Sequence, residues 1–292
     1  MRFTFKGFTL DFTLATTVMG ILNVTPDSFS DGGLYFDKDR AVEQALRMVE
    51  EGAHIIDVGG MSTRPGSEPV EVEEEIRRTA PVIEAIAHRA GVPVSIDTYR
   101  SEVARRALEA GASIVNDISG LRFDADMAAV AAEAGAPVIV MHIKGTPRDM
   151  QANPEYEALV PEILDYLRES MRIAESAGIG QVIVDPGIGF GKTFDQNLEI
   201  INSLEEFVRL GRPVLVGASR KAFIGEILDG APQTDRLEGT SAVVTASILK
   251  GAHIVRVHDV GHMSRVARTA DAIRAGSVEA SRRSPLKKEQ ID

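Results

Sequence analysis

The sequence predicts a single (β/α)8 barrel, an α/β TIM barrel, with an N-terminal β-hairpin, and three observations lead to this fold class. The chain has 292 residues, which suits one barrel of roughly 250 residues with short additions. Short apolar runs recur eight times, and amphipathic stretches with a helical period separate them. No long linker divides the series. An open doubly wound sheet is the alternative, although such sheets usually contain fewer strands.

The first dozen residues alternate apolar and polar side chains on both sides of Lys6 and Gly7, which predicts a hairpin over residues 3–12. Beyond it, a Gly-Ala pair precedes several apolar runs, and such a glycine can end the preceding helix. The runs are rich in β-branched residues without polar alternation, as expected for strands buried on both faces of a parallel sheet. The predicted strands lie within residues 17–24, 52–57, 92–97, 111–116, 135–142, 181–185, 213–217 and 251–256.

Between these strands, apolar side chains recur with the period of a helix, as in Val160, Ile163 and Leu167. Residues 72–87 also show a helical pattern, but Pro81 is expected to kink or interrupt that helix. Residues 277–292 have little apolar content and are expected to form a disordered tail. The predicted barrel domain therefore covers residues 1–276.

Acidic residues outnumber basic ones by 43 to 32, a formal net charge of −11 at pH 7. This balance argues against nucleic acid or an anionic membrane as a partner. No apolar run approaches the ~20 residues of a membrane-spanning helix, and the first residues lack a signal-peptide core. The absence of cysteine excludes disulfides and thiolate metal sites and suits a reducing compartment. A cytoplasmic protein is therefore expected.

Polar side chains stand at the carboxyl ends of nearly all the predicted strands. In this fold the strand ends meet at one rim, where active sites lie. One such residue is usually a cap or a turn, but a whole rim of them favours a polar ligand site. The strand-end residues are Asn23, Asp57, Asp97, Asn116, Asp117, His142, Lys144, Asp185, Ser219, Arg220, Lys221, Arg256, His258 and Asp259.

Three loops add to this rim. Residues 23–33 and 59–67 are rich in Gly, Ser and Pro yet carry Asp, Arg and Phe, which suits lids over a site as well as two solvated loops. Residues 185–193 are glycine-rich, but Pro186 stands where a phosphate-binding Walker loop needs glycine, and the glycine spacing differs from a dinucleotide fingerprint. These glycines would instead let the backbone approach a flat ligand, with Phe190 available for packing.

The six histidines lack the paired spacing of a zinc site. Arg256 and His258 are two residues apart, so they face the same side of a strand and are expected to form a cationic patch. With Arg64 and Lys221, this patch could receive a strongly anionic group such as a phosphate. Asn23 could hold a hard cation such as Mg²⁺ together with phosphate oxygens and water.

Long segments of the chain resemble dihydropteroate synthases. The first of them reads MGILNVTPDSFSDGG at residues 19–33. The others are residues 56–66, 95–99, 115–120, 141–148, 185–192, 219–221 and 256–259, and together they run in order over nearly the whole barrel.

The resemblance implies a transferase of folate biosynthesis that binds small molecules. Such an enzyme condenses 6-hydroxymethyl-7,8-dihydropterin pyrophosphate with 4-aminobenzoate, releasing dihydropteroate and pyrophosphate, with Mg²⁺ as the cofactor. Pyrophosphate departs first, and the arylamine then captures the pterin methylene cation. The family is usually dimeric, so a homodimer is expected, and sulfonamides would target it. Pterin-dependent methyltransferases and a non-catalytic pterin-binding paralogue are the alternatives, and the segments at 19–33 and 219–221 favour the synthase.

The resemblance also implies roles for particular residues. The pterin site would consist of Asp97, Asn116, Ile118, Met141, Asp185, Gly217 and Lys221. The aminobenzoate pocket would consist of Phe29, Thr63, Pro65, Phe190, Lys221 and Ala222. Pyrophosphate would bind Asn23, Arg64, Arg256 and His258, with Asn23 on the metal. The catalytic residues would be Asp31, Asp97, Lys221 and Arg256.

Two positions depart from the family pattern. Met61 stands where many relatives have Glu, which is expected to alter loop packing. Ala222 stands where Ser is frequent, which removes a hydroxyl contact to the aminobenzoate carboxylate. Backbone N–H groups and Lys221 would then carry that contact, so the departures concern affinity more than reaction type.

Overall fold

The computed structural model describes residues 1–25, 34–63, 66–68 and 70–288. Eight parallel strands form one sheet in the order β8-β7-β6-β5-β4-β3-β10-β9. An isolated parallel bridge between Val184 and Val214 joins the two edges, so the sheet curls into a nearly closed barrel and the predicted fold class is confirmed. The strands are β3 (Thr17–Asn23), β4 (Ile55–Gly59), β5 (Val94–Asp97), β6 (Ile114–Asp117), β7 (Val138–Met141), β8 (Val182–Asp185), β9 (Leu215–Val216) and β10 (Ile254–Val257).

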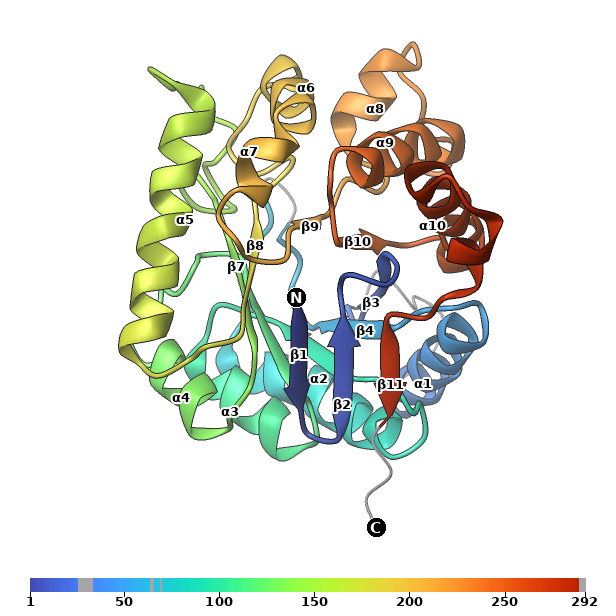
Figure 1. Cartoon of the computed structure of the whole chain (residues 1–292). Helices are drawn as coiled ribbons and strands as arrows, with labels where there is room; N and C mark the ends of the chain where they lie inside the picture. The colour runs from blue at the N-terminus through green and yellow to red at the C-terminus, as the bar shows by residue number, and fades with distance from the viewer. Residues whose placement is uncertain (26–33, 64–65, 69, 289–292) are drawn as a thin grey trace.

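Helices follow the strands and cover the outside of the barrel (Figure 1). They are α1 (Leu34–Glu50), α2 (Val72–Ala87), α3 (Ser101–Glu109), α4 (Met127–Glu133), α5 (Leu159–Ser176), α6 (Phe194–Asn202), α7 (Leu204–Val208), α8 (Ala222–Ile227), α9 (Leu237–Leu249) and α10 (Val260–Ala275). The expected interruption at Pro81 is absent, because α2 continues through it. Val82, Ile83 and Ile86 are buried on the core side, and this packing holds the helix together beyond the proline.

The N-terminal hairpin closes the end of the barrel at which the strands begin, called here the lower end. Its strands β1 (Arg2–Phe5) and β2 (Phe8–Asp11) pair antiparallel, which confirms the predicted hairpin. Its apolar side chains join one layer of residues from the barrel strands to form a single buried cluster. That cluster consists of Phe3, Phe5, Leu10 and Phe12 with Met19, Ile55, Ile114, Ile139, Ile183, Leu215 and Ile254.

The C-terminal residues through Lys288 are ordered, so the expectation of a disordered tail is wrong for this part. The 3₁₀ helix η2 (Val278–Arg282) buries Ala280. Strand β11 (Leu286–Lys288) then pairs antiparallel with β2 and makes a three-stranded sheet, seen at the front of Figure 1. Without β11, the backbone groups along one edge of β2 would be unpaired. The amino-acid composition of the tail does not reveal that such an edge is available to pair with it.

Within the described part of the chain, no helix has both the length and the apolar character needed to cross a bilayer.

Candidate active site

The candidate active site is the next layer of side chains above the buried apolar cluster. Side chains two residues apart in a strand point to the same face. On β5, Ser95 occupies the level of the apolar layer. Two residues further toward the carboxyl end of each strand, the inward-facing residues near the strand ends are therefore reached. We call this set the upper layer: Ile21, Asp57, Asp97, Asn116, Met141, Asp185, Gly217 and Arg256. The structure thus brings together strand-end residues that sequence alone could only place on a common rim.

Arg256 organises the polar part of the upper layer. Its Nε donates to Asp57 Oδ2 at 2.6 Å, and its Nη2 donates to Asp97 Oδ2 at 2.6 Å. Asn116 Nδ2 donates to the same Asp57 Oδ2 at 3.2 Å. These contacts connect β4, β5, β6 and β10. Asp57, which received no role from the sequence, is therefore central to the site. In the sequence, only the position of Asp57 at a strand end indicates a role. That position does not distinguish a carboxylate that contacts ligand from one that orients neighbouring side chains.

Two carboxylate oxygens in this network accept no hydrogen bond from the described residues. Asp57 Oδ1 and Asp97 Oδ1 are buried and find no hydrogen-bond partner among the described residues. Burial raises the pKa of Asp97 to about 7, with Arg256 opposing the rise and Asp57 adding to it. Buried acceptors without partners are costly, so the arrangement favours a ligand that presents N–H donors. The edge of a pterin ring has such donors.

Asp185 stands across the barrel at the end of β8. Its Oδ1 accepts a hydrogen bond from the Gly187 N–H at 2.7 Å. Burial raises the pKa of Asp185 to about 6, while Gly187, Lys221, Lys192 and Arg256 oppose that rise. The carboxylate is therefore largely ionised at pH 7 and can accept from a ligand.

Lys221 and Phe190 lie together beside Asp185. Lys221 Nζ is 4.2 Å from the centroid of the Phe190 ring. A Cβ at Gly189, which has φ +81°, would lie 3.0 Å from Lys221 Cδ. The left-handed conformation favours glycine at this position, and a larger residue would also press on the Lys221 side chain.

An apolar patch completes this side of the site. Ile118, Met141, Ile143 and Met150 form a buried cluster, and Tyr99 and Phe190 pack against it. The resemblance predicts that Ile118 and Met141 contact the faces of a pterin ring. The structure brings these two residues together with Phe190, next to the polar upper layer.

The structure corrects the expectation that Arg256 and His258 form a cationic patch. Burial, with the guanidinium groups of Arg256 and Arg220, lowers the pKa of His258 to about 3, so this imidazole is neutral at pH 7. Ser219 Oγ accepts from the His258 backbone N–H at 3.2 Å and lies 3.0 Å from His258 Nδ1. The hydroxyl proton can therefore go to Nδ1, which leaves the Nε2–H to donate.

The loops are described only in part. Phe29, Asp31, Arg64 and Pro65 lie outside the described residues, so the structure neither places nor displaces them. Thr63 is half-buried, and Ala222 is exposed as the first residue of α8, directly after Lys221. At the departure position in the second loop, Met61 is buried and its Sδ accepts from Tyr99 Oη at 3.8 Å.

Asn23 lies beside the polar network at the end of β3. A Cβ built on Gly59 would be 3.7 Å from Asn23 Oδ1 and 3.8 Å from Asp97 Oδ2, so the two side chains flank Gly59. The described residues contain no group of three or more His, Asp or Glu that could hold a metal ion. A single amide oxygen suits a Mg²⁺ ion that takes most of its ligands from phosphate and water.

Comparisons with known proteins agree on one family. A model of the pterin binding enzyme family matches residues 19–258. The dihydropteroate synthase of Bacillus subtilis is 51% identical over 272 residues, which cover 92% of each protein.

Solved structures give the same result. The dihydropteroate synthase of Clostridium difficile, determined in the presence of pteroic acid, has a TM-score of 0.84 at 45% identity and covers 89% of this chain and 97% of its own. The Yersinia pestis dihydropteroate synthase in a sulfonamide drug complex has a TM-score of 0.89 at 40% identity and covers 94% and 100%. These similarities extend over the strands that carry the polar upper layer. This chain belongs to the dihydropteroate synthase family of pterin-binding enzymes.

Proposed function

We propose that the chain condenses 6-hydroxymethyl-7,8-dihydropterin pyrophosphate with 4-aminobenzoate to give 7,8-dihydropteroate and pyrophosphate. The observation that carries this proposal is the upper layer, where Asp97 Oδ1 is buried without a partner and Arg256 lies within 2.6 Å of Asp97 Oδ2. Such a site offers acceptors for the N–H groups of a flat heterocycle and a cation for its leaving group. The family supplies the reaction that uses both.

The pterin would lie on the upper layer. Asp97 and Asp185 would accept from its N–H groups, while Asn116 and Lys221 would serve its ring acceptors. Ile118 and Met141 would pack on its faces, and Gly217 would leave room beside Arg256. The sequence predicts a polar ligand at the rim, and these residues would form its recognition surface. Among the described residues, a Cβ at Gly217 would meet only Arg256, at 3.9 Å from its Cβ, so the space beside this glycine is open to a ligand.

The chemistry would begin with loss of pyrophosphate. The bond between the pterin methylene carbon and the pyrophosphate oxygen breaks, and its electron pair leaves with pyrophosphate. Arg64 and Arg256 would stabilise that anion, and His258 would donate a neutral hydrogen bond to it. The carboxylates of Asp97 and Asp185 would stabilise the positive charge left on the pterin.

The arylamine nitrogen would then attack the methylene carbon and lose a proton. Phe29, Thr63, Pro65, Phe190, Lys221 and Ala222 would hold 4-aminobenzoate, and Asp31 in the first loop would act near the reacting atoms. Exclusion of water is the protein's further contribution, because water would otherwise capture the cation. The packing of Phe190 against Lys221 and the apolar patch supports this location.

Asn23 would contribute one oxygen to a Mg²⁺ ion bound with the pyrophosphate. Such an ion supplies Lewis-acid stabilisation of the leaving group when it is bound. The position of Asn23 beside Asp97 supports this role.

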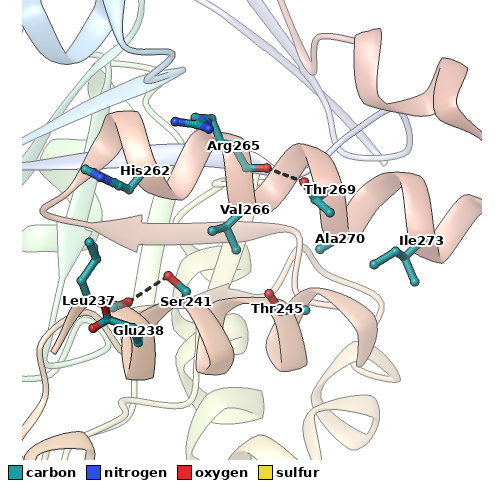
Figure 2. A pocket seen from close by; sticks show the side chains of 10 residues that line it. All are labelled: Leu237, Glu238, Ser241, Thr245, His262, Arg265, Val266, Thr269, Ala270 and Ile273. Atoms are coloured by element: carbon teal, nitrogen blue, oxygen red, sulfur yellow. Dashed lines mark hydrogen bonds between the residues drawn. The ribbon is translucent and has the colours of Figure 1, made fainter.

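We place the protein in the cytoplasm as a homodimer. The outer face of α9 and α10 supports a second copy as the partner, because it contains a groove of about 450 Å³ between the two helices (Figure 2). Large apolar side chains are exposed toward the ends of the two helices, with Leu249 of α9 at 45% and Ile273 of α10 at 61%. Burial of this area in a symmetric contact would remove these side chains from water.

A pyrophosphate-release assay with both substrates and Mg²⁺ tests the proposal. We expect release that requires the pterin substrate and accelerates with 4-aminobenzoate, with dihydropteroate as the product. A slow release without the arylamine is also expected, because the leaving group departs before attack. Pterin binding without release would instead identify a non-catalytic paralogue, and methyl transfer would identify a pterin-dependent methyltransferase.

A further inference from the structure

The loop that follows β8 is built around three glycines in left-handed conformations. Gly187 has φ +73°, Gly189 φ +81° and Gly191 φ +66°. A Cβ at Gly187 would lie 1.9 Å from the carbonyl oxygen of His142, so the backbone of this loop presses directly on the end of β7. We call residues 187–191 the glycine loop. It carries Phe190 and the N–H group that binds Asp185.

A buried lysine anchors the glycine loop from behind. Lys192 is only 2% exposed. Its Nζ lies 2.8 Å from His142 Nδ1 and donates to the carbonyl oxygens of Phe190 at 2.9 Å and His142 at 3.5 Å. Three acceptors match the three donors of an ammonium group, which accepts nothing itself.

His142 is suited to accept from this lysine. Burial and the nearby Lys192 lower the pKa of His142 to about 2, so the ring is neutral and one of its nitrogens can accept. The ring also makes an edge contact with Tyr166, with centroids 4.7 Å apart. The position of Lys192 Nζ is thus defined by a ring that is itself fixed.

The charged groups facing Lys192 come from the site. Burial lowers the pKa of Lys192 well below its ordinary value of 10.5, and Lys221 adds to this change, so Asp185 is the neighbour that favours the charged form. Lys192 and Lys221 in turn help to keep the Asp185 carboxylate ionised. The buried ammonium therefore has an electrostatic connection to a residue of the upper layer.

Other side chains fasten the same loop. Tyr156 Oη donates to the Gly191 carbonyl oxygen at 2.7 Å. Asn197 Oδ1 accepts from the Gly189 N–H at 2.6 Å, and Gln151 Nε2 donates to the Gly189 carbonyl oxygen at 3.0 Å. These contacts hold the outer part of the loop, whereas Lys192 is the group that holds the Phe190 carbonyl.

We propose that Lys192 is a positioning residue that holds the glycine loop, so that Phe190 stays against Lys221 and the Gly187 N–H stays on Asp185. This inference rests on the proposed function, because it assigns Phe190 and Asp185 to substrate binding. A buried charge is unfavourable unless it is fully satisfied, and an apolar side chain could fill the same space. The unfavourable burial of the Lys192 charge is explained if that charge holds the glycine loop and helps to keep Asp185 ionised.

Two substitutions separate the hydrogen bonds of Lys192 from its charge. Lys192→Met keeps the length of the side chain without a donor, and Lys192→Gln keeps N–H donors without the charge. Lys6→Met is the matched control. Lys6 Nζ also donates to a backbone carbonyl, that of Ala112 at 2.8 Å, but it lies at the hairpin end of the barrel.

Steady-state kinetics over a range of pH give the readout. In Lys192→Met we expect the KM for 4-aminobenzoate to rise about tenfold, because Phe190 loses its support. Removal of the positive charge raises the pKa of Asp185, so the acidic limb of kcat/KM for the pterin substrate should move about one pH unit upward. Lys192→Gln should recover part of the KM and keep the pH shift. Lys6→Met should change neither quantity.

Lys192→Met and Lys6→Met with equal KM values and equal pH profiles would overturn the inference. Failure of both Lys192 variants to fold would also overturn it, because Lys192 would then serve the whole fold. If the wild-type protein released no pyrophosphate with both substrates, the proposed function would fail instead.

Discussion

The two inward-facing layers of the barrel differ sharply although they are only two residues apart along each strand. The lower layer packs Met19, Ile55, Ile139 and their neighbours against the hairpin, and it is buried and, apart from Ser95, apolar. The upper layer carries Asp57, Asp97, Asn116, Asp185 and Arg256, with two carboxylate oxygens that have no partner in the described structure. The same scaffold thus separates stability from ligand binding by one step of the strand period.

The largest effect that sharpens this comparison is expected in the lower layer. Ile139→Ala should lower the free energy of unfolding by about 2–5 kcal/mol, because it leaves a cavity in a close-packed cluster. Pterin affinity should stay unchanged in the folded protein. Urea unfolding and calorimetry measure the two quantities, and a loss of affinity comparable to the loss of stability would show that the layers are coupled.

The upper layer should show the reverse pattern. Asp185→Ala should cost about 1–3 kcal/mol of pterin affinity, because N–H donors of the ligand would be left unpaired. Asn116→Ala should act in the same direction. Stability should change little or increase, since burial of the Asp185 carboxylate is unfavourable before ligand binds. Unchanged pterin affinity in both variants, measured by calorimetry, would contradict the assignment of this layer.

Lowering the pH should distinguish the effect of the upper layer on stability from its effect on pterin affinity, and this test needs no mutation. The folded-state pKa values of Asp97, about 7, and Asp185, about 6, are raised above the ordinary value of 3.8. Between the ordinary pKa of 3.8 and these raised values, the folded protein therefore binds more protons than the unfolded chain. The contribution of these groups to stability is fully present below pH 3.8 and is lost as pH rises through 6 to 7.

Pterin affinity should follow the opposite trend over the same window, because protonated carboxyl groups accept fewer N–H bonds. Thermal unfolding and pterin titration at pH 8, 7, 6 and 5 test both trends. Asp97→Asn should weaken both pH dependences, and parallel changes in stability and affinity would show that other groups dominate.

The smallest effect concerns the rim above the upper layer. Ala222→Ser should change the KM for 4-aminobenzoate by roughly tenfold or less, the size of one neutral hydrogen bond, without changing pterin affinity. Ala222 opens α8, so its backbone N–H can already serve a carboxylate. Sulfonamides should compete with 4-aminobenzoate. Competition with the pterin substrate, or a change only in the pterin KM, would place the aminobenzoate pocket elsewhere.

The strands could be predicted because a parallel barrel requires apolar β-branched runs, and the strand ends indicated which side chains share a rim. The role of Asp57 could not be predicted, because a carboxylate that orients Arg256 has the same sequence signature as one that binds ligand. The charge state of His258 depends on burial and on neighbours that come from other strands. The glycine-rich segment that contains Lys192 indicates close approach to a flat ligand, but nothing in it predicts that the lysine turns inward to contact His142.

The end of the chain illustrates another limit. Sparse apolar content suggested disorder after residue 276, yet β11 finds its partner in the backbone of β2. Backbone pairing depends on an available edge and not on side-chain composition. The loops that carry Phe29, Asp31, Arg64 and Pro65 lie outside the described residues, so those assignments stay predictions.

The pairing of β11 with β2 has a consequence for the order of assembly during synthesis. The hairpin strands β1 and β2 are made before the barrel strands, whereas β11, which pairs with β2, is made after them, and β3 must likewise wait for β10 to complete its ladder. A nascent chain therefore exposes unpaired strand edges until β10 and β11 have left the ribosome. Because β1 and β11 flank β2 and run in the same direction, Arg2 and Lys288 lie at opposite ends of the small sheet, so a linker that joins them would have to span the length of the strands.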